Sequence, residues 1–239
     1  MKTKVIYAGN GNGRMDSGNH LKNRKSINIL KVVCIACIAF IALLALFIGC
    51  KEVNKYNDEF ITMTTAKEGE VRIYMAGSGT IAIDWGDGSE IETHTLHDYQ
   101  WYVYNYPDTT SRTITITGNI TSLMCAENQL TKLDVSANTT LVELQCLMNQ
   151  LTNLDVSSNA ELKYLSCGGN KLSILDLSAN TEITILGCRD NNFDVNTLNT
   201  LFETLHDNEG AKLIDVGNNP GADNCNQSIA TNKGWTFIN

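Results

Sequence analysis

One 21-residue pattern recurs four times in the second half of this chain and constrains the fold more tightly than any other feature. The copies begin at Ile120, Leu141, Leu162 and Ile183, and a cysteine stands five residues into each copy, at Cys125, Cys146, Cys167 and Cys188. A unit this short cannot bury its apolar residues alone, so neighbouring copies must stack and share one core. Because adjacent strands lie about 4.8 Å apart, four stacked copies predict a parallel sheet roughly 15–20 Å across.

The spacing resembles the leucine-rich repeat family, and the cysteine column is most similar to internalin-like members from bacterial surfaces. This resemblance implies a short solenoid with four repeats over residues 120–195. Two stretches of each copy alternate as strands do, namely Leu144-x-Cys146 and Leu154-Asp155-Val156 with their equivalents. We therefore expect two strands in every copy.

Two polar columns accompany the leucines. Asn128, Asn149, Asn170 and Asn191 recur at the same interval, and a buried amide can satisfy backbone groups where a strand turns away. The cysteines stand between inward leucines, where a thiol behaves as a small hydrophobe. They lack the Cys-x-x-Cys spacing of zinc sites, and disulfides between copies would need favourable geometry. We expect free buried thiols, with a metal site or disulfides as the alternatives.

A third column is acidic and must face solvent. It consists of Asp134, Asp155 and Asp176, with Ser136, Ser157 and Ser178 beside them, and Asp215 continues it in a later segment. Like charges at this spacing repel by only about 1 kcal/mol per pair in water. We call the three aspartates and three serines of the repeats the Asp/Ser stripe. Our hypothesis is that these six residues help to recognise a basic or hydroxyl-rich partner. The alternative is a solvated turn face without a ligand.

The first 49 residues are typical of a secretory leader. A basic stretch precedes the apolar run Val32–Ile48, which has 17 residues. The run ends Phe47-Ile48-Gly49-Cys50, which resembles the lipobox of bacterial lipoproteins and implies cleavage, acylation of Cys50 and a lipid anchor in the membrane. The alternative is an uncleaved anchor, because a spanning helix needs about 20 apolar residues. Translation could start at Met1 or at Met15.

Residues 53–118 show the period-two alternation of strands, as in Val71, Ile73 and Met75, interrupted by glycine-rich turns. The segment Ile83-Asp84-Trp85-Gly86-Asp87-Gly88-Ser89 resembles the PKD family of extracellular immunoglobulin-like sandwiches. Where that family usually carries His-x-Tyr, this chain has Tyr104-Asn105-Tyr106. The resemblance implies a PKD-like β-sandwich in front of the repeats.

The acidic and imidazole groups of this module do not form a recognisable catalytic or metal-binding pattern. Asp84 and Asp87 stand beside turn glycines, where aspartates usually bond their own backbone, although cation ligation is the alternative. His94 and His97 have no nearby cysteine pair, so we expect solvated side chains instead of metal ligands. We predict no catalytic residue, no cofactor and no metal.

The fourth copy departs from the pattern at Asn196 and Thr197, so we expect a C-terminal cap over residues 194–239. Asp194 is a suitable N-cap for a helix with an apolar face. Strands are expected at Lys212–Val216 and Trp235–Ile238. The predicted fold class is mainly β: a sandwich, a repeat solenoid and an α-containing cap.

Charge excludes one class of partner. Residues 1–49 carry 7 of the 18 basic and 1 of the 26 acidic side chains, which leaves 11 basic and 25 acidic from Cys50 onward. A net charge near −14 repels phosphate backbones, so nucleic-acid binding is not expected. We expect an exported monomer at the cell surface or outer membrane that binds a protein or glycan without catalysis. The alternatives are a structural envelope spacer and a surface hydrolase.

Overall fold

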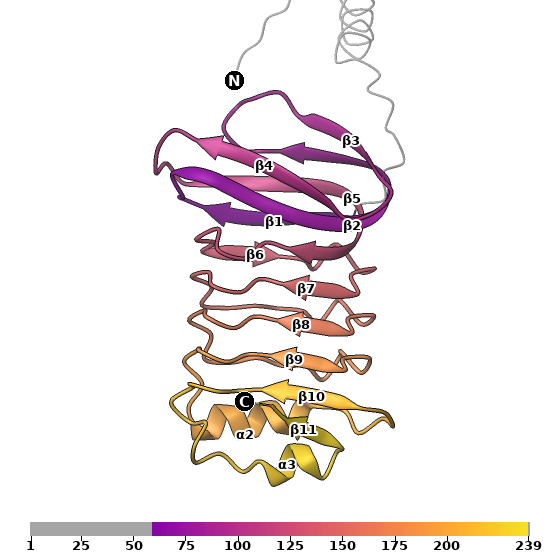
Figure 1. Ribbon diagram of the computed structural model, residues 1–239, viewed down its shortest axis with the longest axis vertical. Helices are drawn as coiled ribbons and strands as arrows, with labels where there is room; N and C mark the ends of the chain where they lie inside the picture. The colour runs from indigo at the N-terminus through magenta and orange to yellow at the C-terminus, as the bar shows by residue number, and fades with distance from the viewer. Residues whose placement is uncertain (1–58, 239) are drawn as a thin grey trace, which may run out of the picture. The chain divides into compact units, whose positions relative to one another are not determined.

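The computed structural model describes residues 59–238, which form eleven strands and two helices (Figure 1). The prediction of a mainly β chain is confirmed. The predicted leader and Cys50 lie outside the described residues. Within residues 59–238, no helix has the length and apolar character needed to cross a bilayer.

The first five strands form an antiparallel module, which we call the β module. Their bounds are β1 Phe60–Thr65, β2 Gly69–Asp84, β3 Glu92–Leu96, β4 Gln100–Tyr106 and β5 Arg112–Met124. The first half of β2 pairs with β4, its second half pairs with β3, and both halves pair with β5. Alternate residues in both halves of β2 are fully buried, as the sequence pattern predicts: Val71, Ile73 and Met75 in the first half and Ile81 and Ile83 in the second.

An irregularity at Gly77 separates the half of β2 that pairs with β4 from the half that pairs with β3. The register of β2 against β5 shifts between Ala76 and Gly77. A Cβ atom at Gly77 would lie only 2.0 Å from the carbonyl oxygen of Asn119 in β5. Only glycine permits so close an approach of two backbones.

Strand β5 joins the β module to the repeats without a break. The sequence places the boundary between these parts at residues 118–120, which lie inside β5. Ser122–Met124 of β5 pair in parallel with β7 (Glu143–Gln145). On the other wall of the first copy, β1 pairs antiparallel with β6 (Lys132–Asp134). The β module therefore pairs with both walls of the first repeat, through β2 with β5 on one wall and β1 with β6 on the other.

The later copies stack in parallel at the predicted interval. After β7 come β8 (Tyr164–Ser166), β9 (Ile185–Gly187), β10 (Lys212–Asp215) and β11 (Trp235–Phe237). Leu144 pairs with Leu165, and Leu165 pairs with Leu186, so each step in space is 21 residues in sequence. We call each such turn a rung. The stacked core that the repeats predict is confirmed.

The expectation of two strands in every copy is wrong. The second stretch forms a strand only in the first copy, as β6, whereas the stretches around Leu154 and Leu175 are irregular. The physical reason is that β6 has β1 as a backbone partner. In later copies this wall is joined instead through side-chain amides: Asn159 Nδ2 donates to the Val135 carbonyl at 3.1 Å and to the Asn138 carbonyl at 2.6 Å.

The predicted asparagine column is confirmed as structural. Asn149 Nδ2 donates to the carbonyls of Cys125 and Cys146 at 3.0 and 3.1 Å, and its Oδ1 accepts from Leu130 N at 2.9 Å. Each amide therefore joins two successive rungs. Asn128, at the start of the column, exchanges two hydrogen bonds with the backbone of Arg72 in β2. A second buried column, not predicted from the sequence, comprises Asn138, Asn159 and Asn180.

A left-handed residue closes the turn after each strand. Glu127, Met148, Gly169 and Asp190 have φ angles of 59°, 53°, 67° and 53°. Their backbone N–H groups donate to carbonyls of the next rung, for example Met148 N to Gly168 O at 2.9 Å. Because only one of the four is glycine, the sequence does not mark this turn clearly.

The C-terminal cap contains α2 (Val195–Thr204) and α3 (Ser228–Thr231). Asp194 accepts a hydrogen bond from Thr197 N at 2.8 Å, which confirms it as the N-cap. Leu198, Leu201 and Phe202 of α2 are fully buried. At the other end of α2, the Lys233 ammonium donates to the carbonyls of Phe202, Glu203 and Leu205. A cation at this end offsets the helix dipole and the free carbonyls.

Candidate functional site

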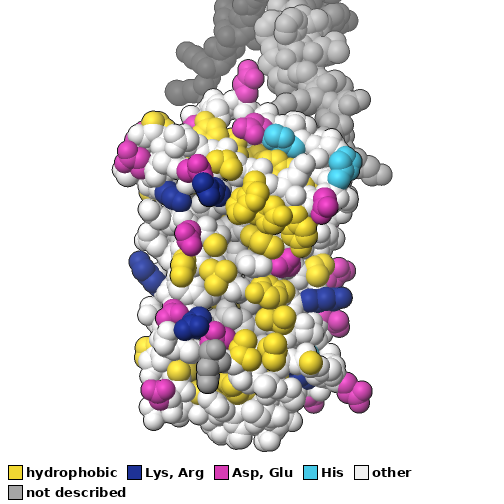
Figure 2. Space-filling model, viewed as in Figure 1, with side chains coloured by type: hydrophobic (Ala, Val, Ile, Leu, Met, Phe, Trp, Pro, Cys, Tyr) yellow, Lys and Arg dark blue, Asp and Glu magenta, His cyan; other side chains and the backbone are white. Residues whose placement is uncertain are grey.

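The outer face of the long sheet combines side chains of the β module and the repeats. Alternation along β4 buries Tyr102 and Tyr106 and leaves Trp101 and Val103 61% and 50% exposed. On the same face, β2 presents Glu70, Arg72 and Tyr74. Hydrophobic side chains gather over this region and continue down the rungs (Figure 2).

Three aromatic rings form a cluster on this face, which we call the aromatic platform. Tyr74 stacks on Tyr99 with ring centroids 5.3 Å apart, and its centroid is 4.6 Å from that of Trp101. Tyr99 is 43% exposed. Contiguous exposed apolar patches, unlike single exposed residues, often mark binding sites.

Glu143 of β7 fixes the platform to the second rung. Its carboxylate accepts hydrogen bonds from the hydroxyls of Tyr99 and Ser122, both at 2.8 Å, and from Gln145 Nε2 at 2.7 Å. Partial burial raises the pKa of Glu143, but these three donors outweigh it and leave the pKa below its usual value. The carboxylate therefore stays ionised and holds Tyr99 in place.

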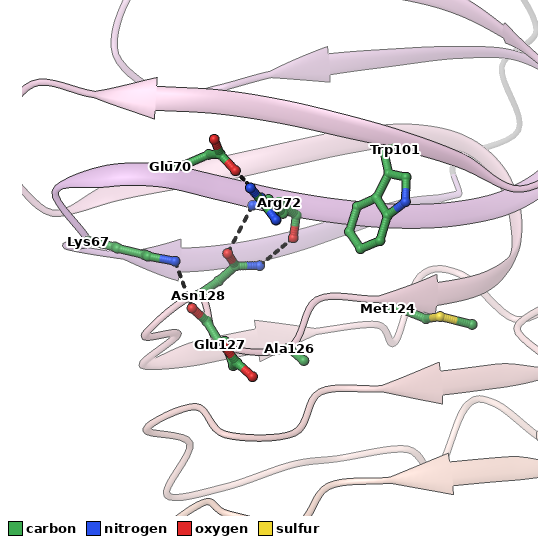
Figure 3. Close-up of a pocket in the computed structure, with 8 residues that line it drawn as sticks. All are labelled: Lys67, Glu70, Arg72, Trp101, Met124, Ala126, Glu127 and Asn128. Atoms are coloured by element: carbon green, nitrogen blue, oxygen red, sulfur yellow. Dashed lines mark hydrogen bonds and ion pairs between the residues drawn. The ribbon is translucent and has the colours of Figure 1, made fainter.

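A groove of about 510 Å³ lies beside the platform, where the β module meets the first rungs (Figure 3). We call it the junction groove. Its lining residues are Lys67, Glu70, Arg72, Trp101, Met124, Ala126, Glu127 and Asn128. Trp101 stands at one side, and the charged side chains stand at the other.

The charges of the junction groove are largely matched among themselves. Arg72 forms an ion pair with Glu70, and Lys67 Nζ donates to the Glu127 carbonyl at 2.8 Å. Desolvation lowers the pKa of Lys67, although the nearby Glu127 opposes that shift. The groove thus offers an aromatic wall, a thioether from Met124 and paired polar groups, which suits recognition better than acid–base chemistry.

The Asp/Ser stripe lies on the other wall of the rungs, with all six residues exposed. Asp134, Asp155 and Asp176 accept hydrogen bonds from the backbone N–H groups two residues later at 2.9, 2.9 and 2.8 Å. Hydrogen bonds from the neighbouring serines lower the pKa of all three carboxyls. Two shallow grooves of about 520 and 340 Å³ run beside the stripe. The geometry establishes a turn-forming role, and the recognition role stays a prediction.

Asp84, Asp87 and His94 of the β module form hydrogen bonds with nearby residues. Asp84 accepts from Gly86 N at 2.8 Å, and Asp87 accepts from Ser89 N at 3.0 Å, as expected for aspartates in turns. His94 Nε2 lies 2.9 Å from Glu92, and His97 is exposed. Across residues 59–238, no three His, Cys, Asp or Glu side chains are grouped closely enough to hold a metal ion.

The four repeat cysteines form the predicted buried column. Cys125, Cys146, Cys167 and Cys188 are fully buried free thiols. Burial raises the pKa of Cys125 and of Cys167 to about 12. Thiols with so little thiolate character are unreactive. They are part of the core, apart from the candidate site.

The aromatic platform is not predicted from the sequence. The available signal was the alternation of β4, which places Trp101 and Val103 on the face opposite the buried Tyr102. Nothing local indicated that Tyr74 of β2 and Glu143 of β7 would lie beside them. Of the residues predicted as a binding face, none belongs to the junction groove.

No protein-family model and no curated protein matches this chain. Among solved structures, the chain is similar to the functional domain of InlJ from Listeria monocytogenes, which includes a cysteine ladder. The two are 38% identical over 41% of this chain and 21% of that chain, with a TM-score of 0.35. This chain therefore spans about one fifth of the length of the InlJ chain. A cysteine ladder is a feature that both proteins have.

Proposed function

We propose that this chain is an exported, lipid-anchored interaction module that binds a partner protein through the aromatic platform and the junction groove, without catalysis. The observation that carries the proposal is the exposed Trp101 beside Tyr74 and Tyr99. Trp, Tyr and Arg dominate binding energies at protein interfaces, and Arg72 lies in the same groove. Because Glu143 already holds Tyr99, little conformational entropy is lost on binding.

The finer assignments from the sequence belong to the same proposal. We take the β module as PKD-like and the stack as a leucine-rich repeat solenoid. The turn at Trp85–Gly88 supports the first assignment, because Tyr104 stacks on Trp85 at 4.8 Å and Tyr106 donates to the Trp85 carbonyl at 2.5 Å. At Gly86, a Cβ would lie 2.2 Å from the Thr113 carbonyl oxygen, so the turn requires glycine.

The carboxylates of the β module are hydrogen-bonded within the module, which favours a binding function over a hydrolase. A surface hydrolase would need Asp and His side chains free to reach a substrate in a defined geometry. Asp87 instead bonds Ser89 and the Tyr104 hydroxyl, and His94 bonds Glu92. An envelope spacer without a ligand would leave the platform without a role.

The binding proposal is tested by capture with the immobilised full chain against surface proteins and, in parallel, against a glycan array. Trp101→Ala should weaken capture of the partner by at least about tenfold, as for a typical hot-spot residue. Ile174→Ala is the matched control, because Ile174 is 69% exposed on the wall of the Asp/Ser stripe. Loss of capture with Ile174→Ala or Asp155→Asn, but not with Trp101→Ala, would move the site to the stripe. A glycan hit that depends on Trp101 would make the ligand a glycan.

The lipid anchor is tested separately. Cells that express the chain should incorporate a labelled fatty acid into it, and Cys50→Ser should abolish the incorporation. An uncleaved anchor predicts an unprocessed chain without the label. Protease treatment of intact cells should remove the described portion if it faces outward, and its protection would indicate the periplasm.

A further inference from the structure

The sheet has four open edges within the part of the chain that the structure describes. β3, β4, β6 and β11 each end a line of pairing. Native proteins protect such edges with charges, shortness or proline, because unpaired N–H and C=O groups recruit further strands. β6 and β11 have three residues each, and β3 carries Glu92 and His94.

β4 has none of these protections. Its sequence, Gln-Trp-Tyr-Val-Tyr-Asn-Tyr, runs for seven residues without a charge, proline or glycine. Aromatic and β-branched residues of this kind strongly favour the extended conformation. Trp101 and Val103 are 61% and 50% exposed, so the outer face of the strand is open as well. Uncharged seven-residue segments of high β propensity readily add a further strand.

We propose that the open edge of β4 binds an extended, basic segment of the partner protein, which adds to the sheet as a further strand. This inference rests on the proposed function, since it assigns the chemistry and the binding mode of that partner. Backbone hydrogen bonds to β4 supply affinity, and alternate side chains of the added strand lie beside Trp101 and Val103.

Charge selects a basic segment. Residues 59–112 carry nine acidic and three basic side chains. Two of the basic groups are already paired, Arg72 with Glu70 and Arg112 with Asp108. Acidic groups remain at the strand: Asp98 precedes it, and Asp87 accepts from the Tyr104 hydroxyl of β4 at 2.6 Å. A second copy of this chain would bring the same negative charge to the edge, whereas lysine or arginine would be attracted.

The test uses the full chain and three capped, fluorescein-labelled heptapeptides. The first alternates Lys and Val, the second replaces each Lys by Glu, and the third methylates alternate backbone nitrogens of the first. Fluorescence polarisation measures binding, and amide hydrogen exchange reports on Gln100–Tyr106. We expect the Lys/Val peptide to bind and to slow exchange of β4 amides, and the other two peptides to bind at least about tenfold more weakly. Val103→Lys should weaken binding by a similar factor, whereas Val103→Thr, which keeps a β-branched residue, should not.

Three results would overturn the inference. The first is that the methylated peptide binds as well as its parent, since a strand needs its N–H groups. The second is that β4 amides exchange at an unchanged rate while the peptide is bound. The third is a dimer that Val103→Lys converts to a monomer, because a second copy would then occupy the edge. The proposed function would survive each result if capture of the natural partner still required the Trp101 side chain.

Discussion

Replacing Asn170 by alanine tests whether the asparagine column supports the stack. The Asn170 amide donates to the carbonyls of Cys146 and Cys167 at 3.0 and 2.9 Å, and its Oδ1 accepts from Leu151 N at 3.0 Å. Asn170 is 7% exposed, so water cannot easily replace the lost partners. The substitution leaves the Leu151 N–H without its hydrogen bond. Each of the two carbonyls loses one of two donors, because Asn149 also donates to the Cys146 carbonyl and Asn191 to the Cys167 carbonyl.

The expected loss of stability combines one unpaired donor with two lost hydrogen bonds. A buried donor left without a partner costs about 1–3 kcal/mol and each lost hydrogen bond about 0.5–1.5 kcal/mol, so Asn170→Ala should reduce the free energy of unfolding by about 2–6 kcal/mol. That is a large share of the roughly 5–15 kcal/mol available to a typical domain. Urea denaturation followed by circular dichroism measures the loss. Hydrogen exchange should show the largest effect on the rungs that contain Cys146 and Cys167, because stacked repeats couple mainly to their neighbours.

The matched control is Asn153→Ala, at an exposed position in the same stack. It should change the free energy of unfolding by less than about 0.5 kcal/mol. A cost below about 1 kcal/mol for Asn170→Ala, or equal stability of the two variants, would contradict this prediction. Either result would mean that side-chain packing and the backbone pairing of the strands maintain the rungs without the asparagine column.

Three further predictions concern Gly77, the cysteine thiols and the stability of the protein at low pH. Gly77→Ala should prevent folding or lower the Tm sharply, because its Cβ would lie 2.0 Å from the Asn119 carbonyl oxygen; a normal Tm by calorimetry would show that the backbone there can relax. Among the described cysteines, iodoacetamide should modify the half-buried Cys225 in the native protein and the four ladder thiols only after denaturation, as peptide mass spectrometry would show. Hydrogen bonds from Tyr104 and Ser89 lower the pKa of Asp87 from 3.8 to about 2, so its stabilising contribution is complete above pH 3.8 and is lost as the pH falls to about 2. Asp87→Asn should flatten acid denaturation over that window, and an unchanged acid limb would contradict the assignment.

The repeat period alone determines most of the stack. Apolar residues at a 21-residue interval can be buried only if equivalent positions lie above one another, so the leucine, cysteine and asparagine columns follow directly from spacing. The same logic locates the Asp194 cap, because α2 begins where the pattern fails. Alternation in β2 and β4 likewise determines which side chains face the core.

The pairing of strands in the tertiary structure decided which side chains become neighbours. A period of two assigns Trp101 to a face but cannot name its neighbours, since strand partners come from distant parts of the chain. Only the pairing of β2 with both β4 and β5, and of β5 with β7, brings Tyr74, Trp101 and Glu143 together. The second wall shows the same dependence, because its stretch becomes a strand only where β1 supplies hydrogen-bonding partners. Local sequence sets which face of an element is buried, whereas long-range backbone hydrogen bonds set the neighbours that build a site.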